Sequence, residues 1–168
     1  MPTPQSEIAR QQIEFARQYT LTLLADVADD EWFVMPAGFK THLAWQMGHL
    51  AMAEYGLTML RVRGKEPDDQ QFISNDFVRL FMKGSTPESD PGRYPPVPEI
   101  RKVFDEVHRR AMEVIPTYSE ELLAEPAPDP TIVSPTKLGA LFFCAAHEML
   151  HAGQIGMLRR MLGKAPVR

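Results

Sequence analysis

The sequence predicts an all-α fold, a four-helix bundle with a long connection between its second and third helices. Four long segments repeat apolar residues at helical spacing, and capping residues, glycine or proline bound them. No segment shows the strict alternation of a convincing strand. The length of 168 residues suits a single domain, residues 1–168, with a sizeable core.

The first two helices are predicted over Ser6–Val27 and from Thr41, a suitable N-cap, to about Val62. Gly64 ends the second helix, which is apolar almost all round and is therefore expected to be buried. The first helix carries one stripe at helical spacing, expected to face the core: Ile8, Gln12, Phe15, Tyr19, Thr22 and Leu23.

The stretch from Gly64 to Val97 is rich in Pro, Gly, Asp and Ser, and it holds one short helical segment, Asp76–Lys83. A connection of this length is typically a crossover or a functional loop. The third helix opens at Pro98, and Pro116 ends or kinks it.

The last helix is predicted from Ser134-Pro135, a cap followed by proline, to Gly163. A short turn over Ser119–Ala124 and a proline-rich loop precede it. Methionines at helical positions are expected to fill the core: Met47, Met52, Met59, Met149, Met157 and Met161.

Composition and charge exclude several classes of protein. A net charge of -4 without a basic stripe argues against nucleic-acid binding. No apolar stretch is long enough to span a membrane, and the N-terminus lacks a signal-peptide pattern. The single cysteine, Cys144, cannot form an internal disulfide, which fits a reducing cytoplasm. We expect a cytoplasmic protein that binds neither nucleic acid nor membrane.

The most informative motif is His147-Glu148-Met149-Leu150-His151, which places two imidazoles one helical turn apart. Two histidines at this spacing can bind one ion, and with the intervening glutamate they match the HExxH pattern of zinc peptidases. A catalytic zinc site normally needs a third protein ligand. The tail after His151 contains no His, Cys, Asp or Glu, so that ligand must lie upstream.

His49 is the best candidate for the third ligand, because it lies in the buried second helix, where an unpaired imidazole is costly. The alternative is a core histidine held by one hydrogen bond. His42 lies about 10 Å away along the helix axis and is expected near the mouth of the pocket or in solvent. His108 is expected at the surface.

The Gly48-His49-Leu50 segment, the His-x-x-x-His pair of the last helix, and the run His151-Ala152-Gly153-Gln154-Ile155 leading into Leu158-Arg159-Arg160 together resemble the DinB/YfiT-like metal-binding bundles. These are the damage-inducible proteins, not the DNA polymerase that shares the name. The resemblance covers nearly the whole chain in helix order and spacing. It implies a bundle of unusual connectivity in which His49, His147 and His151 bind a divalent ion such as zinc or nickel. Some relatives are transferases or isomerases that use low-molecular-weight thiols, and many others have no established activity.

Three further residues lie beside the metal face. Glu148 follows His147 by one residue, about 100° around the helix, which favours the flank of the bundle or a place behind a ligand over a general base. Gln154 could orient a ligating ring or make an interhelical hydrogen bond. Cys144 is expected to be a small buried hydrophobe, with a fourth metal ligand as the alternative.

The leading hypothesis is a metal-dependent enzyme acting on a small molecule, a thiol transferase or a hydrolase, in which the ion lowers the pKa of a bound thiol or water. A low-molecular-weight thiol is the expected partner. Two alternatives stay open, a non-catalytic metal-binding or dimerising bundle and, less favoured, a zinc peptidase using His147-Glu148-x-x-His151. Broadly apolar helices make a homodimer plausible.

Overall fold

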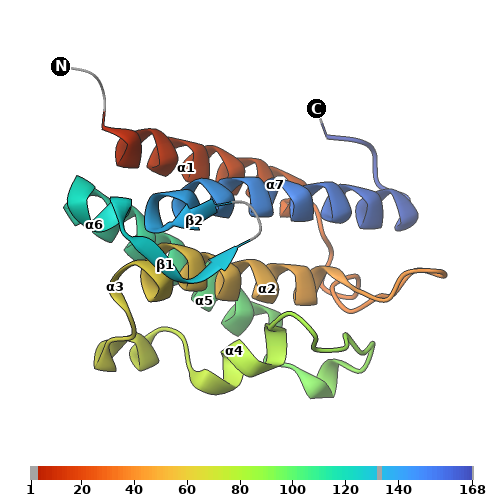
Figure 1. The fold of residues 1–168 in the computed structure, drawn as a ribbon. Coiled ribbons are helices and arrows are strands. Elements are labelled where there is room, and N and C mark those ends of the chain that lie inside the picture. Colours follow the sequence, from red (N-terminus) through yellow and green to blue (C-terminus); the bar gives the residue numbers. More distant parts are fainter. Residues whose placement is uncertain (1–3, 132–133, 168) are drawn as a thin grey trace.

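The computed structural model describes residues 4–131 and 134–167, and four long helices form its bundle (Figure 1). These are α1 (Gln5–Leu24), α2 (Leu43–Tyr55), α5 (Val97–Val114) and α7 (Lys137–Met161). α1 lies parallel to α7, while α2 packs against both α5 and α7. The all-α fold is therefore confirmed. None of the described helices has both the length and the apolar character needed to cross a membrane.

α2 continues through a π-helical turn (Gly56–Leu60) into α3 (Arg61–Arg63), so the second helical segment ends where the sequence indicated. Gly64 terminates it at φ 88°, a conformation that suits glycine. The predicted cap was wrong by one residue. His42 is the N-cap, and its Nδ1 accepts a hydrogen bond from the Trp45 backbone N–H at 3.1 Å. His42 is fully buried, so its expected exposure to solvent was wrong.

The long connection crosses one side of the bundle and contains two 3₁₀ turns (Pro67–Gln71 and Pro91–Arg93) around α4 (Asn75–Phe81). Ser74 caps α4, which packs against α2. The contact is close, because a Cβ atom on Gly48 would lie 2.5 Å from the Phe81 ring. Glycine at position 48 therefore allows the crossover to dock beside His49.

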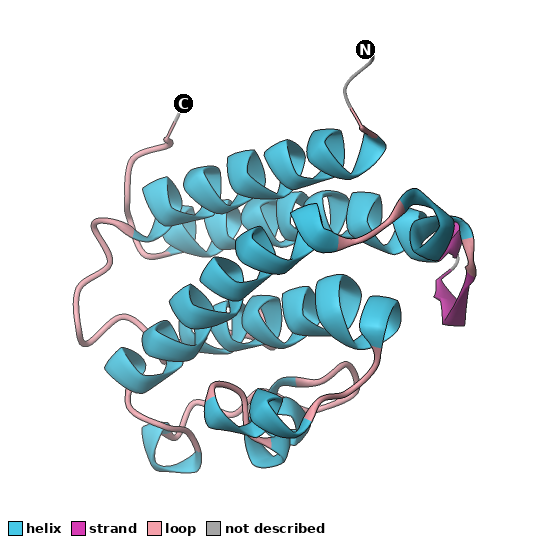
Figure 2. Cartoon of the chain, turned by 90° about the vertical axis from the view of Figure 1, so that its left-hand side faces the viewer, coloured by secondary structure: helices cyan, strands magenta, loops and turns pink. Residues whose placement is uncertain are grey.

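A small hairpin precedes the last helix and corrects the expectation that no strand forms (Figure 2). After a 3₁₀ turn (Ile115–Thr117) and α6 (Glu120–Ala124), β1 (Pro126–Thr131) pairs antiparallel with β2 (Ser134–Thr136). The prolines of the hairpin favour extended backbone, but its residues do not alternate between apolar and polar. The sequence therefore lacked the pattern that predicts a strand. Thr136, rather than Ser134, caps α7 by accepting the Gly139 N–H.

The buried face of α1 differs from the predicted stripe. Phe15 is 66% exposed and Ile8 is 40% exposed. The residues that do face the core are Ala9, Ile13, Ala16, Arg17, Thr20, Leu23 and Leu24. On α7 the expectation of core methionines was also wrong, because Met149, Met157 and Met161 are exposed.

The rotation of α1 is explained by Arg17, whose side chain is 1% exposed. Its Nε donates to Glu148 at 2.9 Å, its Nη2 to Glu54 at 2.7 Å and its Nη1 to the Phe104 carbonyl at 2.9 Å. The guanidinium also stacks on the Phe104 ring at 3.5 Å. Because every edge of the buried guanidinium is occupied by a charged or carbonyl partner, the cost of its desolvation is offset, and Arg17 can hold α1 inward at this position.

His108 completes this cluster, and its expected surface position was wrong. Its Nδ1 lies 2.7 Å from Glu54 and its Nε2 lies 3.1 Å from Glu14. Although burial favours the neutral ring, hydrogen bonds to Glu54 and Glu14 and the charge of Glu54 raise the pKa of His108. Burial likewise opposes ionisation of Glu54, but Arg17 and His108 hold its pKa below the usual value. Arg17 and the His108 ring, whose pKa is raised, thus face two buried carboxylates across four helices.

Replacing Arg17 with leucine should lower the free energy of unfolding by about 3–5 kcal/mol, because Glu54 and Glu148 would stay buried without their cation. Urea denaturation measures the change. Arg10→Leu on the same helix is the matched control, since Arg10 pairs with Glu7 on a partly exposed surface and should change stability far less. Equal losses in both variants would show that the cluster does not determine stability.

Candidate metal centre

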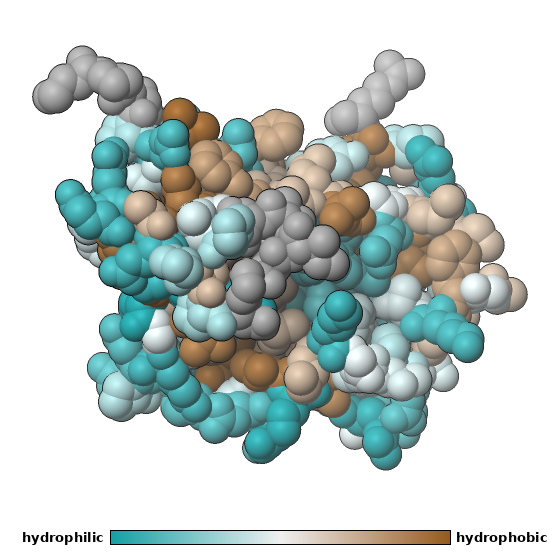
Figure 3. Space-filling model, viewed as in Figure 1, coloured by the Kyte–Doolittle hydropathy of each residue, from teal (hydrophilic) through white to brown (hydrophobic). Residues whose placement is uncertain are grey.

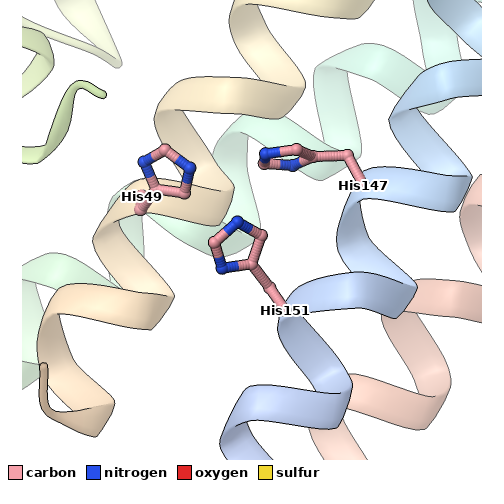
Figure 4. A group of neighbouring side chains, drawn as sticks. All are labelled: His49, His147 and His151. Atoms are coloured by element: carbon pink, nitrogen blue, oxygen red, sulfur yellow. The ribbon is translucent and has the colours of Figure 1, made fainter. Parts of the chain in front are cut away.

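Three histidines from two facing helices converge in the bundle. His49 comes from α2, and His147 and His151 come from α7 (Figure 4). One ring nitrogen of each lies within 4.8 Å of the others. The ring centroids are 5.2 Å apart for His49 and His147, 4.6 Å for His49 and His151, and 4.5 Å for His147 and His151. The residues predicted as ligands therefore lie close enough to share one ion.

The crossover segment fixes the His49 ring. Its Nδ1 lies 2.8 Å from the Phe81 carbonyl oxygen. A carbonyl only accepts, so Nδ1 carries the proton and Nε2 keeps its lone pair. Trp45 stacks on a face of this ring, with centroids 4.7 Å apart and planes inclined by 9°. The docking of Phe81 over Gly48 thus sets which nitrogen of His49 can bind a cation.

A pair of glutamines fixes the His151 ring. Its Nδ1 donates to Oε1 of Gln46 at 2.6 Å. The amide of Gln46 cannot turn around without losing its other bonds, because its Nε2 donates to Thr41 at 3.1 Å and to Gln154 at 3.0 Å. His151 therefore also keeps the lone pair on Nε2. Gln154 makes the interhelical hydrogen bond and acts on His151 only through Gln46.

His147 is held less tightly than the other two rings. Phe143 meets it edge-on, with centroids 5.6 Å apart. No ring nitrogen of His147 is hydrogen-bonded to a residue in the described part of the chain. Cys144, one turn earlier, is 2% exposed and does not belong to the group of ligand atoms. Burial raises the pKa of its thiol, so it is the small buried hydrophobe that was expected.

All three rings are neutral at physiological pH. Burial lowers the pKa of His147 to about 4 and that of His151 to about 3, and the neighbouring imidazoles add to both effects. Burial also lowers the pKa of His49. A neutral imidazole keeps one nitrogen lone pair that can bind a cation, and three such rings lie within reach of one ion, so this donor set fits a divalent metal.

Glu148 points away from the three rings, as the helical angle predicted. It is 2% exposed, and its carboxylate accepts hydrogen bonds from Arg17 on α1. A peptidase base must face the ion and its bound water. This placement disfavours the zinc-peptidase hypothesis, although the five-residue motif itself matches.

Helix bundles with histidines on two facing helices form a class of α-helical metal-binding folds. The family model of the DinB superfamily matches residues 12–155, which include all three histidines. The chain belongs to the DinB superfamily. None of the curated proteins matches it.

Sequence reasoning missed Gln46 and the Phe81 carbonyl, the two groups that orient the rings. Gln46 could have been singled out from the sequence, because it is a polar residue in an apolar helix, three positions before His49. Its partner His151 is 105 residues away, so spacing could not reveal the contact. A backbone carbonyl has no sequence signature at all.

Gln46→Leu should weaken zinc binding by about 10–100-fold, because His151 would lose the acceptor that fixes its tautomer. Gln46→Glu retains that acceptor and should bind zinc at least as tightly as the wild type. Chelator competition measures both affinities, with the exposed Gln11→Leu as control. This role would be contradicted by an unchanged zinc affinity in Gln46→Leu, or by an equal loss of affinity in Gln46→Leu and Gln46→Glu.

Proposed function

We propose that this protein is a metal-dependent enzyme that uses His49, His147 and His151 to bind one divalent ion and to act on a small molecule. The observation that carries the proposal is the convergence of three neutral imidazoles from α2 and α7. Membership of the DinB superfamily supports a metal site in this position. Zinc and nickel are the proposed ions, because both accept imidazole nitrogen as a ligand.

The side chains around the rings serve orientation and exclusion of water. Gln46 and the Phe81 carbonyl hold the two Nδ1 protons, which aims Nε2 of His151 and His49 inward. The face of Trp45 covers His49, and Phe143 meets His147 edge-on. When bound, the ion supplies Lewis acidity that lowers the pKa of a coordinated thiol or water.

A thiol nucleophile suits this site better than water. The group of ligand atoms contains no carboxylate, and Glu148 is engaged by Arg17. Activation of water commonly relies on a positioned base, whereas a thiol has an intrinsic pKa of about 8.5 and needs far less help. We therefore favour thiol transfer, with a low-molecular-weight thiol as co-substrate, over hydrolysis.

Adding Zn²⁺ or Ni²⁺ to metal-free protein should raise its melting temperature, because the ion binds the native state. At a free concentration of 100 times the Kd the stabilisation should be about 2.7 kcal/mol. His147→Ala should abolish the shift. His108→Gln is the control, since it perturbs the ionic cluster and should lower the melting temperature while keeping the shift on adding metal. Equal shifts in the wild type and His147→Ala would mean that the ion binds elsewhere.

Metal-loaded protein should accelerate the reaction of cysteine or glutathione with an electrophilic fluorogenic reagent, and His49→Ala should remove the acceleration. Glu148→Gln should change the rate little once metal is bound, whereas loss of a general base would cost about 10²–10⁴-fold. p-Nitrophenyl acetate supplied without thiol tests the hydrolase form. A large loss in Glu148→Gln at full metal occupancy would contradict the proposed mechanism.

A further inference from the structure

The two flanks of α7 beside its histidine pair, His147 and His151, differ in burial. Each residue of a helix turns by about 100°, so Glu148 and Leu150 lie about 80° to either side of the mean direction of the pair. Glu148 is 2% exposed and faces Arg17 on α1, whereas Leu150 is 64% exposed. The two histidines are themselves half-buried. Solvent therefore reaches the pair from the flank that carries Leu150.

α2 reaches solvent beside His49 at one residue. From His42 to Met59 every residue is buried except Met52, which is half-buried. Met52 follows His49 by three residues, and residues at this spacing are neighbours on a helix surface. The side chain of α2 that a small molecule can contact beside His49 is therefore an apolar thioether.

The solvent-facing flank of the histidine pair is uncharged. Phe143 precedes His147 by one turn, and Leu150 follows Phe143 by seven residues, so all three lie on one stripe of α7. In the described stretch of α7 from Phe142 to Gln154, the one Asp, Glu, Lys or Arg is Glu148, which is buried. Figure 3 shows brown atoms over the middle of α7, on the side of the molecule that Figure 1 presents.

We propose that Met52, Phe143 and Leu150 form an apolar rim that selects a substrate whose group next to the reacting atom is an uncharged aryl or alkyl group. This inference rests on the proposed function, because it requires an ion on the three histidines that binds one atom of the substrate. Leu150 is the specificity-determining residue, since its side chain is exposed whereas Met52 and Phe143 are half-buried.

The ion and the rim select different parts of a substrate. The three imidazoles are neutral and contribute no negative charge, so a divalent ion bound to them attracts an anionic donor such as a thiolate. Beside the ion, an aryl or alkyl group gains by covering Leu150. A carboxylate in the same place would lose water without gaining a partner. The ligand that fits best thus combines an anionic sulfur with an apolar substituent.

The thiols benzenethiol and 4-mercaptobenzoate test the rim by binding alone, because they differ only in a carboxylate opposite the sulfur. Isothermal titration calorimetry of Zn²⁺-loaded protein, at a pH where both thiols are ionised, gives the two dissociation constants. Benzenethiol should bind about tenfold more tightly. Leu150→Lys should reverse this order, because an ammonium group would attract the carboxylate. Leu150→Met should keep the order, because it replaces one apolar side chain with another of similar volume.

Met149→Lys is the matched control. It adds the same charge to the same helix at a residue that is 38% exposed, but Met149 lies about 200° around α7 from His147. This variant should keep the wild-type preference for benzenethiol. Both lysine substitutions are at exposed residues, so circular dichroism should report an unchanged fold.

Equal dissociation constants for the two thiols in the wild type would overturn the rim and leave the proposed function standing. The same holds if Leu150→Lys and Met149→Lys change the preference alike. Failure of the Zn²⁺-loaded wild type to bind either thiol would instead contradict the proposed function, and the rim with it.

Discussion

The guanidinium of Arg17 lies between the carboxylates of Glu54 and Glu148, with His108 on the far side of Glu54. Each of these four residues comes from a different long helix. A buried cation can satisfy its donors in few arrangements, so the cluster fixes how α1, α2, α5 and α7 are rotated and how far each is shifted along its axis. The orientation of every other face in the bundle follows from that constraint.

The rotation of α7 shows this dependence most clearly. Because Glu148 faces Arg17 on α1, His147 and His151 lie on the side of α7 that faces His49 on α2. The same rotation leaves Met149 and Met157 outward. In a peptidase built on the same five residues, the glutamate faces the ion instead. Identical spacing thus supports different chemistry, depending on which neighbour binds the central carboxylate.

The sequence could predict the helices and the three histidines because both depend on local spacing. It could not predict the inward face of α1, since Ile8 and Phe15 repeat with the same period as the buried row that contains Ile13 and Thr20. Pattern reading places an arginine in solvent, and here Arg17 is buried by partners 37 and 131 residues away. Such polar contacts are determined by the tertiary arrangement, and so are those that orient His151.

Two polar clusters among the described residues differ in character. Arg17, His108, Glu54 and Glu148 neutralise one another and join the helices without any ion. The three imidazoles, in contrast, are neutral and bring one ring nitrogen each within 4.8 Å of the others. A structural zinc site closes its coordination sphere with protein ligands because folding depends on the metal. Here the ionic cluster already joins the helices, so folding does not require the three histidines to close a coordination sphere, and this supports the proposed catalytic use of the site.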